Sequence, residues 1–112
     1  MADFNRTFDH IKAQLGPLAE QSLKEFAGQG KQDATAFLEQ SRANLEKWTQ
    51  QLANNEIDED EFTWLVESQK AAAEMTALQA ANAGVVRIEQ FRNSVLKLVI
   101  KTAVATVAGG AA

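Results

Sequence analysis

The sequence contains no cysteine, so it can form neither a disulfide nor a thiolate metal site. It also lacks tyrosine, and no alternating run of Val, Ile and Thr between turn residues marks a strand. No block of five or more Lys and Arg residues is present, and the net charge is -4. The chain therefore has no general attraction for nucleic acid, and we expect no nucleic-acid partner.

The amino terminus has no long apolar run either. Asp3, Arg6 and Asp9 stand where a general secretion signal would need apolar residues. The missing cysteine also fits a reducing compartment. We therefore expect a cytoplasmic protein, although export by another route stays open.

What the sequence does have is a strong helical bias. Alanine is the commonest residue, and Gln, Glu, Lys and Leu fill most other positions. These residues lose little conformational freedom in a helix. The 112 residues, 46% of them hydrophobic, suffice for one core. The sequence therefore predicts a single all-α domain over residues 1–112.

Apolar side chains spaced by three and four residues predict the first two helices. The first should span about 3–27, with a kink rather than a complete break near Pro17. Gly28 and Gly30 suit its carboxyl-terminal end, and Asp33 suits the cap of the next helix. That second helix should span about 33–53.

The stretch from Asn54 to Phe62 resembles the second half of a calcium-binding loop, in which Glu61 occupies the position of the final glutamate. Leu52 falls at an early ligand position of that loop and offers no oxygen. Asp58 and Glu61 instead match a capping box, in which each side chain accepts from the backbone N–H of the other residue. We predict a helix start at about residue 59, and no metal or other cofactor.

Helical character then continues to about residue 108. A continuous helix over 59–108, which we favour, would give a helical hairpin that dimerises into a four-helix bundle. A break near Gly84 would instead give four antiparallel helices within one chain.

No catalytic site is predicted. His10 is the single histidine, it has no cysteine partner, and no second carboxylate–histidine pair recurs for a di-metal centre. We therefore expect a protein that is not an enzyme.

Six residues are predicted to make contacts of interest. Trp48 and Trp64 flank the turn and would meet in an antiparallel hairpin, as a shared aromatic cluster or as a hot spot for a partner. The last helix is apolar over more than one stripe, so other subunits, a partner or lipid should cover it. Its candidate contact residues are Phe91, Val95, Leu98 and Val99.

Two functions follow from these patterns. The first is a non-enzymatic assembly or adaptor protein, acting through helix–helix self-association as a homo-oligomer or through binding to a helical protein partner. The alternative is a lipid- or membrane-interacting amphipathic protein, surface-coating or pore-forming. It would use the apolar last helix, which also carries basic residues: Arg87, Arg92, Lys97 and Lys101.

Overall fold

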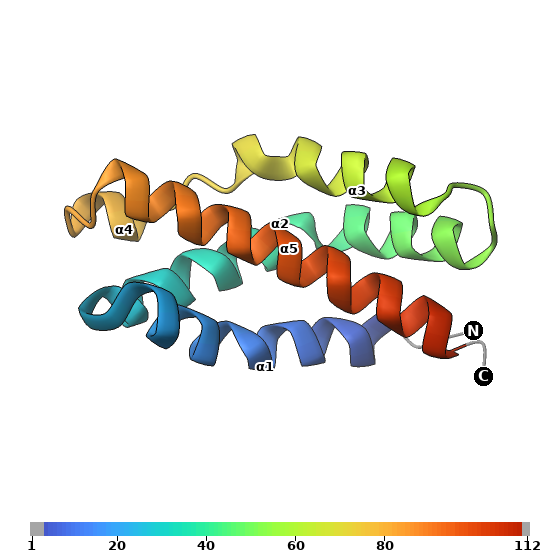
Figure 1. The fold of residues 1–112 in the computed structure, drawn as a ribbon, viewed down its shortest axis with the longest axis horizontal. Helices are drawn as coiled ribbons and strands as arrows, with labels where there is room; N and C mark the ends of the chain where they lie inside the picture. The colour runs from blue at the N-terminus through green and yellow to red at the C-terminus, as the bar shows by residue number, and fades with distance from the viewer. Residues whose placement is uncertain (1–3, 111–112) are drawn as a thin grey trace.

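The computed structural model describes residues 4–110, and every regular element within that range is helical. The prediction of an all-α fold is confirmed. In chain order the elements are α1 (Phe4–Leu23), η1 (Lys24–Phe26), α2 (Ala27–Ala53), α3 (Glu59–Glu67), η2 (Ser68–Ala72), α4 (Thr76–Ala80) and α5 (Val85–Gly110). Helices α2 and α5 each pack against both α1 and α3. In Figure 1, α2 and α5 lie between α1 and α3.

Helix α1 has the predicted apolar face. Of the apolar residues spaced by three and four, Phe4, Phe8, Ile11 and Leu15 are buried, whereas Leu18 is only half-buried. The helix continues through Pro17, so the Gly16–Pro17 pair does not divide it.

The predicted boundary between the first two helices is wrong. Helix α1 ends at Leu23, and the chain turns at Lys24, whose φ is +54°. Gly28, Gly30 and Asp33, expected in the connection, all lie inside α2. A Cβ at Gly30 would stand 2.1 Å from Leu23 Cδ1 and 3.3 Å from Phe91 Cζ. Gly30 therefore serves the close packing of the core rather than a turn.

The predicted start of α3 is confirmed. Asp58 Oδ1 accepts from the Glu61 N–H at 2.8 Å, and Glu61 Oε1 accepts from the Asp58 N–H at 3.3 Å, which completes the capping box. Phe62 is buried, and Ile57 packs against the core on the other side of the cap. The stretch that resembles half of a calcium loop is thus a helix start.

The favoured continuous helix over 59–108 is wrong, and the alternative break is present. The break is longer than predicted. Helix α3 ends at Glu67, only η2 and the short helix α4 follow, and the next long helix begins at Val85. Three residues of this segment have positive φ angles, which interrupt helical geometry: Met75 (57°), Asn82 (61°) and Gly84 (99°).

Contacts with other helices explain why this alanine-rich segment does not continue as one helix. Leu78 and Met75 are buried in the core. The Asp33 carboxylate of α2 accepts from the first N–H groups of α4, and Arg92 Nε of α5 donates to the Ala73 carbonyl at 2.7 Å. Tertiary contacts of this kind override a helix propensity of a few tenths of a kcal/mol per residue.

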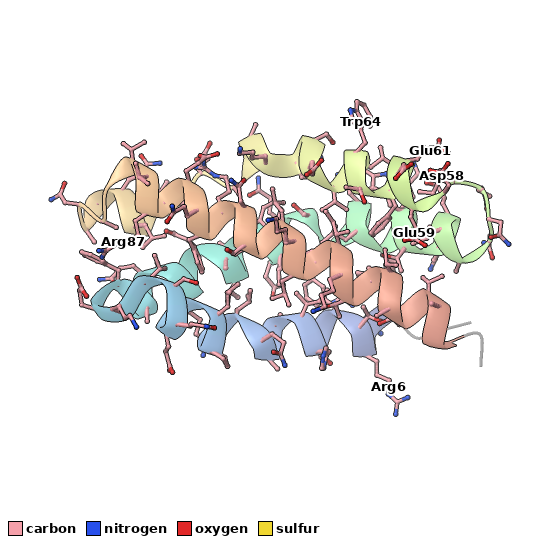
Figure 2. All side chains as sticks on the ribbon, viewed as in Figure 1. Arg6, Asp58, Glu59, Glu61, Trp64 and Arg87 are labelled. Atoms are coloured by element: carbon pink, nitrogen blue, oxygen red, sulfur yellow. The ribbon has the colours of Figure 1, made fainter. Side chains whose placement is uncertain are left out.

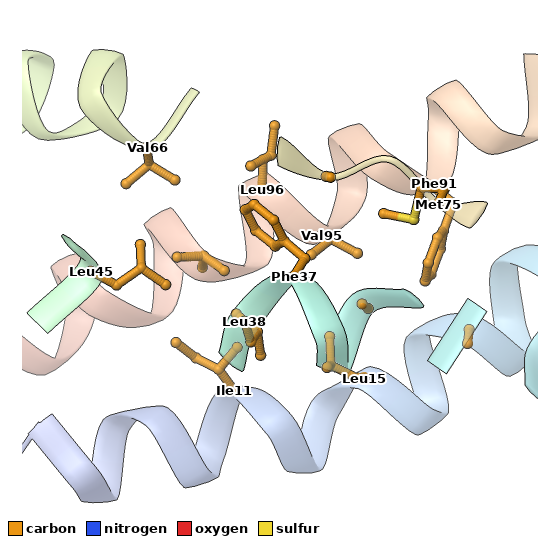
Figure 3. Close-up of a cluster of buried hydrophobic side chains, with 14 of the residues drawn as sticks. Ile11, Leu15, Phe37, Leu38, Leu45, Val66, Met75, Phe91, Val95 and Leu96 are labelled. Atoms are coloured by element: carbon orange, nitrogen blue, oxygen red, sulfur yellow. The ribbon is translucent and has the colours of Figure 1, made fainter. Parts of the chain in front are cut away.

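One hydrophobic core runs along the helices. Figure 3 shows Phe37 of α2 among side chains from the other helices, with Ile11 and Leu15 on one side and Val66 on the other. Helix α5 contributes its inner face to this core through Phe91, Val95, Leu96, Val99 and Ala103.

Candidate interaction surface

Most of the predicted contact residues are covered within the chain itself. Phe91, Val95 and Val99 are each 1% exposed in the core, and Leu98 is half-buried. Trp48 is half-buried and packs against the core. The inner face of α5 therefore finds its cover in α1, α2 and α3.

Trp64 is different, and the prediction that it shares a buried aromatic cluster with Trp48 is wrong. Its side chain is 68% exposed, and Figure 2 shows it pointing outward from α3, away from the other helices. The reason is the helical repeat. Phe62 and Val66 occupy the inward positions of α3, and Trp64 lies about 200° around the helix from Phe62 at about 100° per residue.

A shallow hollow of about 310 Å³ lies beside the indole. It is lined by Asp60, Glu61, Trp64 and Leu65, which together we call the Trp64 surface. Leu65 is half-buried and the two acidic residues are exposed. The hollow thus combines an aromatic wall with a carboxylate rim, an arrangement that fits an apolar group with a positive charge next to it.

Further acidic residues lie close to the Trp64 surface. Glu56, Asp58 and Glu59 are exposed near the Trp64 surface, and the sequence holds no Lys or Arg between Lys47 and Lys70. Among the ion pairs of the described residues, none involves this acidic group. Because no ion pair between residues 4 and 110 compensates these charges, they attract cations from outside the chain.

A second exposed apolar patch lies at the start of α5. Val85 is 84% exposed and Val86 is 70% exposed. Arg87 follows, with its guanidinium 5.4 Å from the centre of the Phe26 ring and its Nη1 3.4 Å from Glu25 Oε1. We call Val85, Val86 and Arg87 the Val85 patch. The sequence prediction missed it, although both valines precede the buried residue Ile88 that starts the apolar stripe of α5.

The surroundings of His10 and the placement of possible metal ligands bear on the chemistry of the described residues. His10 is exposed and lines an open groove of about 440 Å³ with Gln14 and Lys101, and no carboxylate lines that groove. Between residues 4 and 110, no cluster of three or more His, Cys, Asp or Glu is placed to hold a metal ion. In the same range, no helix has a stretch long and apolar enough to cross a bilayer.

Comparison with known proteins assigns no function to this surface. The chain matches no protein-family model, no curated protein and no solved structure. Its function is therefore argued from the Trp64 surface and its surroundings.

Proposed function

We propose that this protein is a non-enzymatic assembly or adaptor protein that binds another protein chain, a copy of itself or a helical partner, through the Trp64 surface. Its helices form an antiparallel bundle whose core is complete within one chain. The bundle acts as a rigid frame that presents α3 to the partner. The observation that carries this proposal is the 68% exposure of Trp64.

Covering an exposed tryptophan removes a large apolar surface from water, which lowers the free energy of a complex. Tryptophan is enriched among the few residues that supply most of the binding energy in protein interfaces. Its flat, apolar ring offers a large contact area, and its indole N–H still finds a polar partner. The neighbouring carboxylates of Asp60 and Glu61 add selectivity, because they favour a cationic partner and repel an anionic one.

The lipid-binding alternative has weaker support. It relied on an apolar α5 face that needs external cover, whereas Phe91, Val95 and Val99 are buried inside the chain. The exposed tryptophan, for its part, lies beside acidic residues, which an anionic membrane surface repels. Lys97 and Lys101 of α5 are exposed, so they are the residues through which α5 would contact anionic lipid.

A displayed library of random peptides tests the proposal directly. The native protein is immobilised and used to select binders, with Trp64→Ser protein as the counter-selection. We expect enriched peptides that the native protein retains and the Trp64→Ser variant releases. A Trp48→Phe variant serves as the matched control and should retain the same peptides, because Trp48 is packed against the core. Enriched peptides that bind all three proteins equally would contradict the proposal.

A flotation experiment tests the alternative. The native protein is mixed with anionic phospholipid vesicles and centrifuged through a density gradient. We expect it to stay at the bottom with the unbound fraction. Flotation that a Lys97→Gln/Lys101→Gln variant loses, and a Trp64→Ser variant keeps, would favour the lipid-binding function instead.

A further inference from the structure

The described chain leaves large apolar side chains mostly exposed at only Trp64, Val85 and Val86. They form the Trp64 surface and the Val85 patch. Figure 2 shows Arg87 of the Val85 patch at one end of the elongated molecule, and Asp58 and Glu59 toward the other. Trp64 itself projects from the side of the molecule, between Asp58 and the end that carries Arg87, so the two patches are separate surfaces.

The charges beside the two patches are opposite in sign. Asp60 and Glu61 line the hollow at Trp64, while Arg87 directly follows the exposed valines. Arg87 is also held in place, since its guanidinium lies over the Phe26 ring and contacts Glu25 through Nη1. A guanidinium has five N–H donors, so this contact leaves others able to reach a second carboxylate.

A symmetric contact between two Trp64 surfaces is disfavoured. It would bring Asp60 and Glu61 of one copy against the same residues of the other, with Asp58 and Glu59 close behind. Like charges that are brought together across an interface repel each other and oppose the contact. A partner for the Trp64 surface must therefore present a different surface, apolar at its centre and positively charged at its edge.

We propose that the Trp64 surface of one copy binds the Val85 patch of a second copy. This inference rests on the proposed function and names the partner. Val85 and Val86 cover the indole and Leu65, and Arg87 faces the carboxylates of Asp60 and Glu61. Both halves of this interface are present on every chain.

Because the two patches are different surfaces of the same chain, the contact is heterologous, or head to tail. Such a heterologous contact leaves one free patch at each end of a dimer, so further copies add until a ring closes or a filament grows. Each patch is small, so the association is weak, rises with concentration and weakens as salt screens the charges.

Sedimentation of the native protein and two variants gives the first test. The variants are Trp64→Ser and the double change Val85→Ser/Val86→Ser. All three positions are exposed, so both variants should melt like the native protein. We expect the mean mass of the native protein to rise with concentration, and each variant to weaken the association by about tenfold or more, as truncation of a central apolar contact does. A native protein that stays monomeric at every concentration would overturn this inference.

Mixing the two variants gives the decisive test. Trp64→Ser protein keeps an intact Val85 patch, and the valine variant keeps an intact Trp64 surface. An equimolar mixture should therefore form dimers, which cannot extend further because both remaining patches are defective. Each variant alone should remain monomeric at the same concentration. A mixture that sediments like the separate variants would overturn the head-to-tail contact.

These outcomes are separable from the proposed function. If the mixture fails to form dimers while displayed peptides still bind in a Trp64-dependent manner, the second copy is the wrong partner and the Trp64 surface still binds protein. If no peptide depends on Trp64 either, the proposed function itself is contradicted.

Discussion

The carboxylate of Asp33 in α2 accepts a hydrogen bond from the backbone N–H of Leu78 in α4, with 2.8 Å between Oδ2 and N. Its other oxygen, Oδ1, accepts from the Ala77 N–H at 2.9 Å. The residue that precedes α4, Met75, offers no side-chain cap. Asp33 thus caps, from 44 residues away in the sequence, a helix that has no local cap of its own.

Replacing Asp33 with alanine should destabilise the protein. The change leaves the N–H groups of Ala77 and Leu78 without their acceptor in a largely buried site, which costs about 1–3 kcal/mol. Urea unfolding would measure the loss, and hydrogen exchange at Leu78 should accelerate more than exchange in the middle of α2. Asp9→Ala is the matched control, because Asp9 is exposed on α1. Equal effects of the two substitutions would contradict the capping role.

The two glycines early in α2 should respond to alanine in opposite directions. Nothing lies within 4 Å of a Cβ at Gly28, so Gly28→Ala should stabilise by about 0.5–1 kcal/mol through helix propensity. At Gly30 the same methyl group meets Leu23 and Phe91, and Gly30→Ala should destabilise by about 1–3 kcal/mol through overpacking. Thermal melts of both variants provide the comparison. A stabilising Gly30→Ala would show that Leu23 moves aside without cost.

The features of the fold that the sequence predicted are those set by interactions between residues close together in the chain. The α1 face and the Asp58–Glu61 capping box both depend on neighbours three or four residues apart. These features were predicted because their causes lie within a single turn of helix.

The chain breaks depend on contacts that are remote in sequence, and so they were missed or misplaced. Lys24 and Met75 adopt positive φ angles although neither is glycine or asparagine. Gly30 resembles a helix end but is needed where Leu23 and Phe91 meet α2. Asp33 resembles the cap of its own helix but caps α4. For Gly30 and Asp33 the residue type was informative, but its partner could not be identified from spacing.

The candidate site was predicted only in part. Trp64 was singled out, but its exposure was not foreseen, although its position opposite Phe62 and Val66 on the helical wheel indicates it. The sequence does not show which helices pack against α5, so it does not reveal that Phe91, Val95 and Val99 are covered within the chain.

The buried position of Val99 predicts a large difference between two equivalent substitutions in α5. Val99→Lys places a charge where the side chain is 1% exposed, and an uncompensated buried charge costs about 3–5 kcal/mol. Val86→Lys makes the same chemical change at a side chain that is 70% exposed, and it should leave the melting temperature nearly unchanged. Similar melting of the two variants would contradict the placement of Val99 in the core.

Glu89 should make a pH-dependent contribution to stability. A hydrogen bond from Lys70 holds the pKa of Glu89 below its ordinary value of 4.5, and the charges of Lys70 and Arg92 lower this pKa further against the opposing effect of desolvation. Because the pKa is lower in the folded state, the contribution is present above pH 4.5 and is lost as the pH falls through the folded-state pKa.

Denaturant unfolding of Glu89→Gln protein tests this expectation. The variant should be slightly less stable than the native protein at neutral pH, and the difference should disappear in acid. Glu20→Gln is the matched control, because it removes an exposed acid that takes part in none of the ion pairs among residues 4–110. A deficit of the Glu89→Gln variant that grows in acid would contradict the sign of the pKa shift.

The central claim is that Trp64, rather than Trp48 or the buried side of α5, contacts the partner. The indole N–H signals of the two tryptophans in a ¹H–¹⁵N spectrum test it most directly, after assignment with a Trp64→Phe variant. On addition of a peptide selected by the native protein, the account predicts that the Trp64 indole signal shifts while the Trp48 signal stays in place. A shift of the Trp48 signal alone, or of neither signal while the peptide is bound, would contradict it.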